Sequence, residues 1–349
     1  MPPGYLPATT PGPLDERTMK RIDLPVAFIS GINGQDGSYL AELLLSKGYQ
    51  VKGLIRRTST PELGNLSKVL DNPQFQLVHG DLTDYHSIST LIRDLRPLEI
   101  YNLGAMSFVG ESWNQVRLTN EVNYLGFLNV LEAVRAVARE ADEMPRIYQA
   151  SSSEMYGNQP APQNEDTPMI PRSPYGVSKL AAHALARVYR ESFGMFICAG
   201  VLFNHESPRR GSEFVTRKMV QGIAGIKRGE LSHVHLGTLS AKRDWGHAKD
   251  YVRAMWLMLQ QPEPLDYVVA TGETWSVRDF FLEAMKAADL PGVPEDYVIH
   301  ERSLDRPAEI NVLCGDATLA RNILGWKPEY SFRELVGEMI ESELFGSGL

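Results

Sequence analysis

Short apolar runs alternate with longer amphipathic runs from Leu24 to Phe203, and this alternation constrains the fold more than any other feature of the chain. The short runs predict strands at 25–30, 49–55, 75–79, 99–103, 146–151 and 195–203, and the longer runs predict helices near 37–47, 84–95, 117–140 and 173–193. Apolar strands separated by helices are typical of a parallel sheet covered on both faces. The pattern therefore predicts an α/β fold with a Rossmann-type, doubly wound parallel sheet and right-handed crossovers.

The rhythm changes after Phe203. Residues 204–245 are rich in Arg, Gly and Ser, and beyond them the pattern predicts helices near 248–260 and 276–288, a strand at 266–270 and two short C-terminal helices. We interpret this part as a smaller, mixed α/β C-terminal lobe for the substrate. The predicted organisation is a Pro-rich flexible tail at 1–22, a nucleotide-binding domain at 23–203 and a substrate lobe at 204–349, with chain crossings back to the first domain around 233–275.

The charge balance is mildly acidic, with 35 Lys and Arg residues against 43 Asp and Glu residues and a formal net charge of −8. A phosphate backbone requires a basic face, so nucleic acid is not expected as a partner. No apolar run approaches the ~20 residues of a membrane span and no signal peptide is recognised, so we expect no membrane association and a cytoplasmic location. Cys198 and Cys314 are too few for a disulfide framework or a multi-cysteine zinc site, and no metal is expected.

A glycine-rich turn with the spacing G-x-x-G-x-x-G directly follows the first predicted strand and opens a helix. Such a turn lets backbone N–H groups approach a pyrophosphate at a helix N-terminus. The alternative is an ordinary strand-to-helix turn, but the position in the chain is the one that a dinucleotide site requires. The predicted cofactor contacts here are Gly31, Asn33, Gly34, Gln35, Asp36 and Gly37.

The second predicted strand ends at Ile55 and is followed by Arg56, Arg57, Thr58 and Ser59. An acidic residue at this point normally holds a ribose 2′-hydroxyl, whereas two guanidiniums and two hydroxyls suit a 2′-phosphate. The residues therefore favour NADP over NAD, and a solvated basic turn is the alternative. Further cofactor contacts are expected after the third and fourth strands, from Asp81 and Leu82 near the adenine and from Leu103, Gly104 and Ala105.

Tyr175 and Lys179 are four residues apart on a predicted helix and so share one face. A free tyrosine has a pKa of ~10, and a nearby ammonium together with a positive nicotinamide would lower it. Lys179 could also hold the nicotinamide ribose. A Y-x-x-x-K pair often occurs by chance on helix surfaces, but behind a dinucleotide turn it indicates a base for hydride chemistry.

Ser152 and Glu154 follow the fifth predicted strand, where open α/β sheets place their sites. The Ser152 hydroxyl can hydrogen-bond a substrate hydroxyl. Oxidation by a tyrosine and a lysine needs no carboxyl, so Glu154 suggests an added proton-transfer step. A structural carboxyl that caps a helix is the alternative.

The chain resembles the extended short-chain dehydrogenases/reductases and, within them, the GDP-mannose 4,6-dehydratase family. The resemblance runs from about Val26 to about Phe332 and is carried by 31–42, 55–57, 151–157, 171–176, 202–211, 214–218, 241–246, 250–252, 270–273 and 306–309. The stretch Phe-Asn-His-Glu-Ser-Pro-Arg-Arg-Gly, which ends at Gly211, is far more specific to this group than the glycine turn.

The resemblance implies a hydro-lyase that converts GDP-mannose to GDP-4-dehydro-6-deoxy-mannose with a tightly held NADP. Ser152 would bind the C4 hydroxyl, and Tyr175 with Lys179 would remove its proton while hydride leaves C4. Glu154 would then take the C5 proton and protonate the departing C6 hydroxyl, after which the hydride returns to C6. Ser152 and Glu154 would thus be both catalytic and substrate-binding residues.

The resemblance also places residues around the two ligands. Asn204, Lys218, Arg243, Arg306 and Glu309 would surround GDP, Ser107 would meet both cofactor and substrate, and His205 and Arg210 would touch NADP, Arg210 in its own or a neighbouring subunit. The family implies a homodimer or homotetramer in which the Arg56-Arg57 loop reaches a neighbour's cofactor site. His247 is interpreted as a structural residue.

Three residues depart from the family pattern, and other functions stay open as alternatives. Met106, Phe108 and Leu118 replace polar or aromatic residues that are frequent in the family, which bears on substrate preference. A related 4-keto-6-deoxy-sugar reductase or epimerase would not require Glu154, and a dehydratase for another GDP-hexose or GDP-heptose would keep it. A non-catalytic NADP-binding regulator would lack Tyr175 or Lys179, and both are present.

Overall fold

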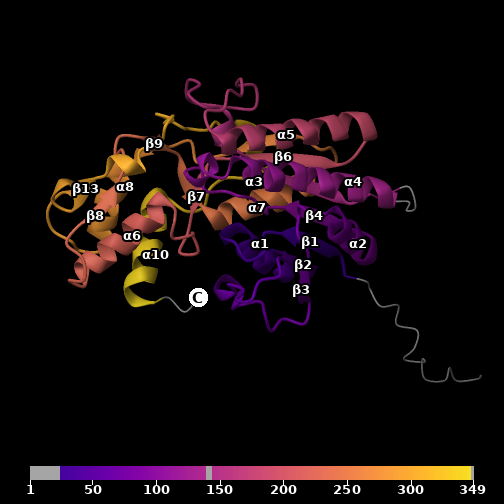
Figure 1. Ribbon diagram of the computed structural model, residues 1–349, viewed down its shortest axis with the longest axis horizontal. Coiled ribbons are helices and arrows are strands. Elements are labelled where there is room, and N and C mark those ends of the chain that lie inside the picture. Colours follow the sequence, from indigo (N-terminus) through magenta and orange to yellow (C-terminus); the bar gives the residue numbers. More distant parts are fainter. Residues whose placement is uncertain (1–23, 139–143, 347–349) are drawn as a thin grey trace, which may run out of the picture.

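The computed structural model of the protein describes residues 24–138 and 144–346, so the predicted tail at 1–22 lies outside the described residues. Seven parallel strands form one sheet in the order β11-β6-β5-β4-β1-β2-β3. They are β1 (Val26–Ser30), β2 (Gln50–Ile55), β3 (Phe75–His79), β4 (Glu99–Asn102), β5 (Arg146–Ser152), β6 (Ile197–Leu202) and β11 (Asp266–Val269). Helices cover both faces of this sheet, which confirms the predicted fold class (Figure 1).

The strand order reverses beside β1, because the chain runs outward through β2 and β3 and then returns to β4. Ligands of open parallel sheets bind at such a reversal, outside the carboxyl ends of the strands. Ser30 ends β1 and Asn102 ends β4, and the Ser30 hydroxyl donates to Oδ1 of Asn102 at 2.8 Å. The crevice above these two residues is therefore where a sheet of this order offers a ligand site.

The helices divide between the faces by their apolar stripes. One face carries α2 (Tyr85–Leu95), α4 (Gly126–Ala138) and α5 (Pro174–Phe193), and the other carries α1 (Gln35–Ser46), α7 (Ala248–Leu259) and α9 (Thr318–Leu324). The start of α5 is fixed locally, since Pro174 occupies its first turn and the Ser173 hydroxyl accepts from the Gly176 N–H at 3.0 Å. This cap positions the side chains of the first turns of α5.

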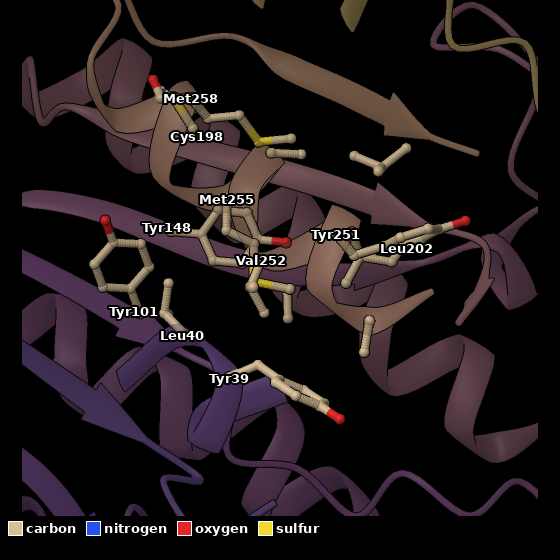
Figure 2. Packing of buried hydrophobic residues seen from close by; sticks show 14 of the residues in the cluster. Tyr39, Leu40, Tyr101, Tyr148, Cys198, Leu202, Tyr251, Val252, Met255 and Met258 are labelled. Atoms are coloured by element: carbon tan, nitrogen blue, oxygen red, sulfur yellow. Dashed lines mark hydrogen bonds between the residues drawn. The ribbon is translucent and has the colours of Figure 1, made fainter. Parts of the chain in front are cut away.

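Helix α7 comes from the second half of the chain but packs against the seven-stranded sheet. Figure 2 shows Tyr251, Met255 and Met258 of α7 packed near Tyr148 of β5 and Cys198 of β6. All five side chains are buried, and α7 also contacts α1. Burying one such side chain contributes roughly 1.5–3 kcal/mol, so α7 is part of the main core.

The remaining elements form a smaller lobe around a separate apolar cluster. Its helices are α6 (Val215–Lys227), α8 (Val277–Ala287) and α10 (Phe332–Phe345), and its paired short strands are β7 (Asn204–Glu206) with β10 (Trp245–His247), β9 (Lys242–Arg243) with β12 (Trp275–Ser276) and β8 (Val234–Leu236) with β13 (Val298–His300). Trp275 stacks on Phe332 with ring centroids 4.6 Å apart, and Trp245 meets Phe280 edge-on at 5.2 Å. These aromatic rings join the helices of this lobe.

Three elements differ from the prediction. The run predicted as one helix at 117–140 consists of α3 (Val116–Asn120), a π-helical turn η4 (Glu121–Leu125) and α4. Helix α6 was not predicted, because 204–245 is rich in Arg, Gly and Ser, yet Met219, Val220 and Ile223 line one buried stripe. Helix α10 has 14 residues and is not short.

Short 3₁₀ turns complete the described chain. They are η2 (Gly64–Leu66), η3 (Glu111–Trp113), η5 (Ser153–Met155), η6 (Pro294–Asp296) and η7 (Arg302–Leu304). Two of them lie near the crevice. η5 directly follows the end of β5, and η2 contacts α1, the helix that follows the glycine turn. The loops at this edge of the sheet are thereby held close to the site.

Candidate functional site

Two hollows lie at the carboxyl ends of the strands. One is a cleft of about 510 Å³. It is lined by the glycine turn, the loop after β4, the end of β5, the start of α5 and the segment 203–214. A second hollow of about 530 Å³ lies beside the ends of β2 and β3. The predicted site residues divide between these two hollows and a cluster of charges next to the cleft.

The glycine turn is shaped for close approach of a backbone. Gly31 has φ +71°, and a Cβ at this position would come within 2.8 Å of the Gly104 nitrogen. A Cβ at Gly37 would meet the Gly31 carbonyl oxygen at 2.3 Å. The Ser30 hydroxyl accepts from the N–H groups of Leu103 and Gly104 at 3.1 and 3.0 Å, which fixes the β4 loop beside the turn. Gly31, Asn33, Gly34, Gln35, Asp36, Gly37, Leu103, Gly104, Ala105 and Ser107 all line the cleft.

The second hollow contains the basic residues that were predicted to select the cofactor. Arg56, Arg57 and Thr58 line it together with Asp81, and all three are exposed. Ser59 is exposed but does not line this hollow. Leu82 packs into the apolar cluster beneath α2 and α4, so its side chain lines neither hollow.

Tyr175 and Lys179 both line the cleft and are both buried. The Lys179 ammonium lies 5.8 Å from the Tyr175 ring centroid and donates to the Ala150 carbonyl at 2.9 Å. Burial raises the pKa of Tyr175 to about 12, although its hydrogen bond with Ser152 acts in the lowering direction. Burial also lowers the pKa of Lys179 to about 8. Burial therefore outweighs the nearby side chains at Tyr175, and the lowering of its pKa by an ammonium together with a positive nicotinamide stays a prediction.

Ser152 and Glu154 lie at the end of β5, in the same cleft. The Ser152 hydroxyl accepts from the Glu154 N–H at 3.3 Å, which begins the turn η5. Both residues are only 8% exposed, so Glu154 is a carboxylate largely removed from water. Its partner is Arg306, whose Nη1 lies 3.2 Å from Oε1 of Glu154.

Charged residues of the second lobe continue from this pair. Arg243 donates to Oε1 of Glu309 at 2.7 Å and to the carbonyl oxygens of Lys242 and Ile310 at 2.9 and 2.8 Å. Arg306 and Asn204 line the cleft, whereas Arg243 and Glu309 lie behind Arg306. Lys218 is exposed on α6 and lines neither hollow.

His205 ties β7 to the glycine turn. Its Nε2 lies 2.8 Å from Oδ2 of Asp36, its Nδ1 lies 2.8 Å from the Phe203 carbonyl, and its ring stacks on Tyr251 at 4.5 Å. Arg210 lies 3.5 Å above the Phe214 ring and 2.9 Å from the buried carboxylate of Glu206. His205 and Arg210 both line the cleft.

Two polar residues that the sequence reasoning missed hold this arrangement in place. Asn123 lies in the π-helical turn, where its amide accepts from the Met106 N–H at 2.8 Å and donates to the Ser178 hydroxyl at 2.9 Å. Arg209 donates to the Ser38 hydroxyl at 3.0 Å and also pairs with Glu42. A polar residue inside an apolar helical run was the available signal for Asn123, but its partners come from distant segments.

Of the residues that depart from the family, Phe108 lines the cleft, whereas Met106 and Leu118 do not. Phe108 meets Phe214 edge-on with ring centroids 5.7 Å apart, and both rings line the cleft. The Met106 side chain is half-buried, and Leu118 is 37% exposed on α3. His247 is fully buried, bonds Glu338 at 2.9 Å and accepts from the Lys249 N–H at 3.0 Å, as a structural residue would.

Two absences hold for the part of the chain that the structure describes. Within 24–138 and 144–346, no group of three or more His, Cys, Asp or Glu side chains is arranged to hold a metal ion. In the same residues no helix has the length and apolarity needed to cross a membrane.

The family model and the related proteins that match this chain all carry the same description. A sequence model of the family described as GDP-mannose 4,6 dehydratase matches residues 28–339. The human GDP-mannose 4,6 dehydratase is 46% identical over 341 residues, which cover 91% of this chain and 91% of that protein. GDP-mannose 4,6 dehydratase 2 of Arabidopsis thaliana is 47% identical over 325 residues, covering 91% of this chain and 87% of that protein.

A solved structure matches the whole architecture. UDP-glucose 4-epimerase of Thermus thermophilus, solved as a complex with NAD, superimposes with a TM-score of 0.80 at 25% identity. The match covers 92% of this chain and 99% of that one, so both the sheet and the smaller lobe are shared.

Proposed function

The chain belongs to the GDP-mannose 4,6-dehydratase family, and from this premise we propose that it converts GDP-mannose to GDP-4-dehydro-6-deoxy-mannose and water. One observation carries the proposal. The tyrosine and lysine suited to hydride chemistry, Tyr175 and Lys179, share a single cleft with the buried carboxylate of Glu154, which elimination requires. A reductase with the same fold has no use for that carboxylate.

The cleft fits a dinucleotide, and the basic hollow favours NADP. The pyrophosphate would lie over the turn Gly31–Gly37, where an added Cβ would collide with neighbouring backbone. Arg56, Arg57 and Thr58 offer cationic and hydroxyl donors for a 2′-phosphate in the neighbouring hollow. When bound, the nicotinamide supplies a hydride acceptor for C4 of the hexose and later a donor for C6, so that no external oxidant is consumed.

The chain's own residues would manage the protons. Tyr175 would accept the proton of the C4 hydroxyl, which Ser152 holds in place. Glu154 would remove the C5 proton, acidified by the C4 carbonyl, and deliver it to the C6 oxygen that leaves as water. The proton accepted by Tyr175 balances the one that C5 regains when the product forms. Lys179 would supply the positive charge that favours the Tyr175 phenolate once substrate has excluded water.

The nucleotide end of the substrate would lie against the second lobe. Arg306 reaches the cleft, Arg243 stands behind it with Glu309, and Asn204 lines the wall between them and His205. Guanidinium groups are suited to a diphosphate, and Glu309 can accept from ribose hydroxyls. Lys218 lies apart, so a contact with GDP would require movement of its side chain.

Assembly and location complete the proposal. A homodimer or homotetramer would let the exposed segment that begins at Arg56 contact a neighbouring cofactor site. In this structure Glu62 and Asn65 of that segment lie against the chain's own glycine turn, where Asn65 donates to the Asn33 carbonyl at 3.1 Å. The cytoplasmic location stays a prediction from the sequence.

The decisive experiment uses the purified full chain with GDP-mannose and no added NADP. The expected product is lighter than the substrate by one water in mass spectrometry, which would show both dehydration and a cofactor retained through purification. A control incubation supplies GDP-4-dehydro-6-deoxy-mannose with NADPH. Turnover only in that control would assign the protein to the reductases, and no dehydration even after NADP is added would overturn the proposal.

A further inference from the structure

Four charged side chains form an alternating group at the junction of the cleft and the second lobe. Arg306 lies 3.2 Å from Glu154 and 3.8 Å from Glu309, and Arg243 lies 2.7 Å from Glu309. Two cations and two anions therefore neutralise one another without a ligand. The group links the residue proposed to abstract the C5 proton to the residues proposed to bind the diphosphate.

The two arginines differ in how firmly they are held. Arg243 has a side chain only 7% exposed and donates to a carboxylate and to two backbone carbonyls. Arg306 has a side chain 28% exposed, and within the described residues its guanidinium pairs with the carboxylates of Glu154 and Glu309. Since Arg243 already occupies Glu309, the close partner left to Arg306 is Glu154. Arg306 is thus the more exposed and less firmly held cation of the group.

We propose that Arg306 holds Glu154 in the nucleotide-free enzyme and that the diphosphate of the arriving sugar nucleotide draws Arg306 away, releasing the carboxylate toward the hexose. The inference rests on the proposed function and adds a positioning role for Arg306. A diphosphate carries more negative charge than one carboxylate and can accept two guanidinium hydrogen bonds, so it competes well for Arg306. The free enzyme avoids an unpaired buried carboxylate, which would be strongly unfavourable.

This exchange couples the base to occupancy of the nucleotide site. While Oε1 of Glu154 is engaged by Arg306, that oxygen is not available to a substrate proton. Binding of the diphosphate frees that oxygen, and in a bound sugar nucleotide the attached hexose then lies in the cleft beside it. The ion pair and the diphosphate compete for one guanidinium, so removing the Glu154 charge should strengthen nucleotide binding.

The test is a titration of the NADP-loaded protein with GDP, which lacks the hexose, by calorimetry. Glu154→Gln keeps the size of the side chain and should bind GDP about three- to tenfold more tightly than the unaltered protein. The same substitution in an Arg306→Gln background, titrated to millimolar GDP, should change the affinity by less than about twofold. The double-mutant comparison isolates the pair from the charge of Glu154 alone.

A matched control variant tests whether the effect is specific to Glu154. Circular-dichroism melting curves of all variants show whether each one is folded. Glu213 also lines the cleft and makes no ion pair with Arg306 among the described residues, so Glu213→Gln should leave GDP affinity within about twofold. Equal tightening by Glu154→Gln in both backgrounds, or no tightening at all, would overturn the exchange while leaving the proposed function intact. Failure of the unaltered, NADP-loaded protein to bind GDP would instead overturn the proposed function.

Discussion

Nε2 of His205 lies 2.8 Å from Oδ2 of Asp36, which joins the glycine turn to β7 across the cleft. Burial acts to lower the pKa of His205, but the Asp36 carboxylate outweighs it and raises this pKa above the ordinary value of 6.5. Burial acts to raise the pKa of Asp36, but the charge of His205 and its hydrogen bond hold it below 3.8. The pair is therefore charged over a wide range of pH.

The ion pair should stabilise the protein most at pH values between the lowered pKa of Asp36 and the raised pKa of His205. The contribution of His205 is complete below about pH 6.5 and is lost as pH rises through its raised value, because the unfolded histidine loses its proton first. The contribution of Asp36 is complete above its ordinary value and is lost only in acid. We predict that His205→Gln lowers the free energy of unfolding more at about pH 6 than at about pH 9, measured by denaturant titration.

The control for this prediction is His233→Gln, because His233 is exposed and its ring contacts the hydroxyl of the neighbouring Ser232. That substitution should change the free energy of unfolding by less than about 0.5 kcal/mol at either pH. A His205→Gln effect that does not vary with pH would show that the Asp36 contact is not an ion pair.

Glu154→Gln should separate oxidation from elimination. The amide cannot accept the C5 proton, so dehydration of GDP-mannose should fall by about 10²- to 10⁴-fold. Reduction of the bound NADP by the substrate should persist, because Tyr175 and Lys179 are unaltered. Single-turnover absorbance of the reduced nicotinamide and mass spectrometry of the product measure the two steps. Normal dehydration by this variant would exclude Glu154 as the base.

Lys179 should give the cofactor-free protein an alkaline gain in stability. Burial lowers the pKa of Lys179 from 10.5 to about 8, so between these values the unfolded chain binds more protons than the folded one. The free energy of unfolding should therefore rise with pH across this window, by at most about 3 kcal/mol. Lys179→Met should lack this rise. Denaturant titrations of both proteins at about pH 7.5 and pH 9.5 test the difference, and parallel behaviour would contradict it.

Arg56 and Arg57 should determine the choice between the two nicotinamide cofactors. Removing two cationic donors from a phosphate site costs enough for a loss of about 10- to 100-fold in affinity. We expect the Arg56→Ala/Arg57→Ala protein, stripped of cofactor, to lose this much affinity for NADP while NAD binding changes by less than about threefold. Fluorescence titrations with both cofactors measure it. An equal loss for NAD would show that the arginines serve the pyrophosphate or the fold.

Asn123 should stabilise both the loop after β4 and helix α5. Asn123→Ala removes hydrogen bonds to both backbone groups of the half-buried Met106 and to the buried Ser178 hydroxyl, so we expect a loss of about 2–3 kcal/mol in the free energy of unfolding. Turnover should fall as the loop loses its position. Asn120→Ala is the matched control in the same helical run, since its amide donates to the Val116 carbonyl at an exposed site. Equal effects of the two substitutions would contradict the role.

The strands of the sheet could be predicted because each is a short, mainly apolar and β-rich run between longer amphipathic runs. The seventh strand, β11, was predicted as a strand near 266–270, but its place beside β6 depends on a contact with Ala199 and its neighbours that no local pattern encodes. The π-helical turn was not predictable, because a helix with one widened turn keeps almost the same apolar periodicity. Helix α6 was missed because the segment 204–245 around it is rich in Arg, Gly and Ser, which hides its buried apolar stripe.

The candidate site was predictable where function imposes a local spacing. The turn that begins at Gly31 and the pair Tyr175 and Lys179 are examples, since each is defined by neighbours in sequence. The contact of Arg306 with Glu154 joins residues 152 positions apart, so only the folded chain reveals it. The raised pKa of Tyr175 likewise depends on burial, which the motif does not report.

The position of α7 and β11 has a consequence for synthesis of the protein on the ribosome. Helix α1, near the start of the described chain, packs against α7, which is made more than 200 residues later. A nascent chain that has emerged only to β6 would expose the apolar face shown in Figure 2. Chaperone occupancy on stalled nascent chains should therefore persist until about residue 269 has left the exit tunnel and then fall sharply.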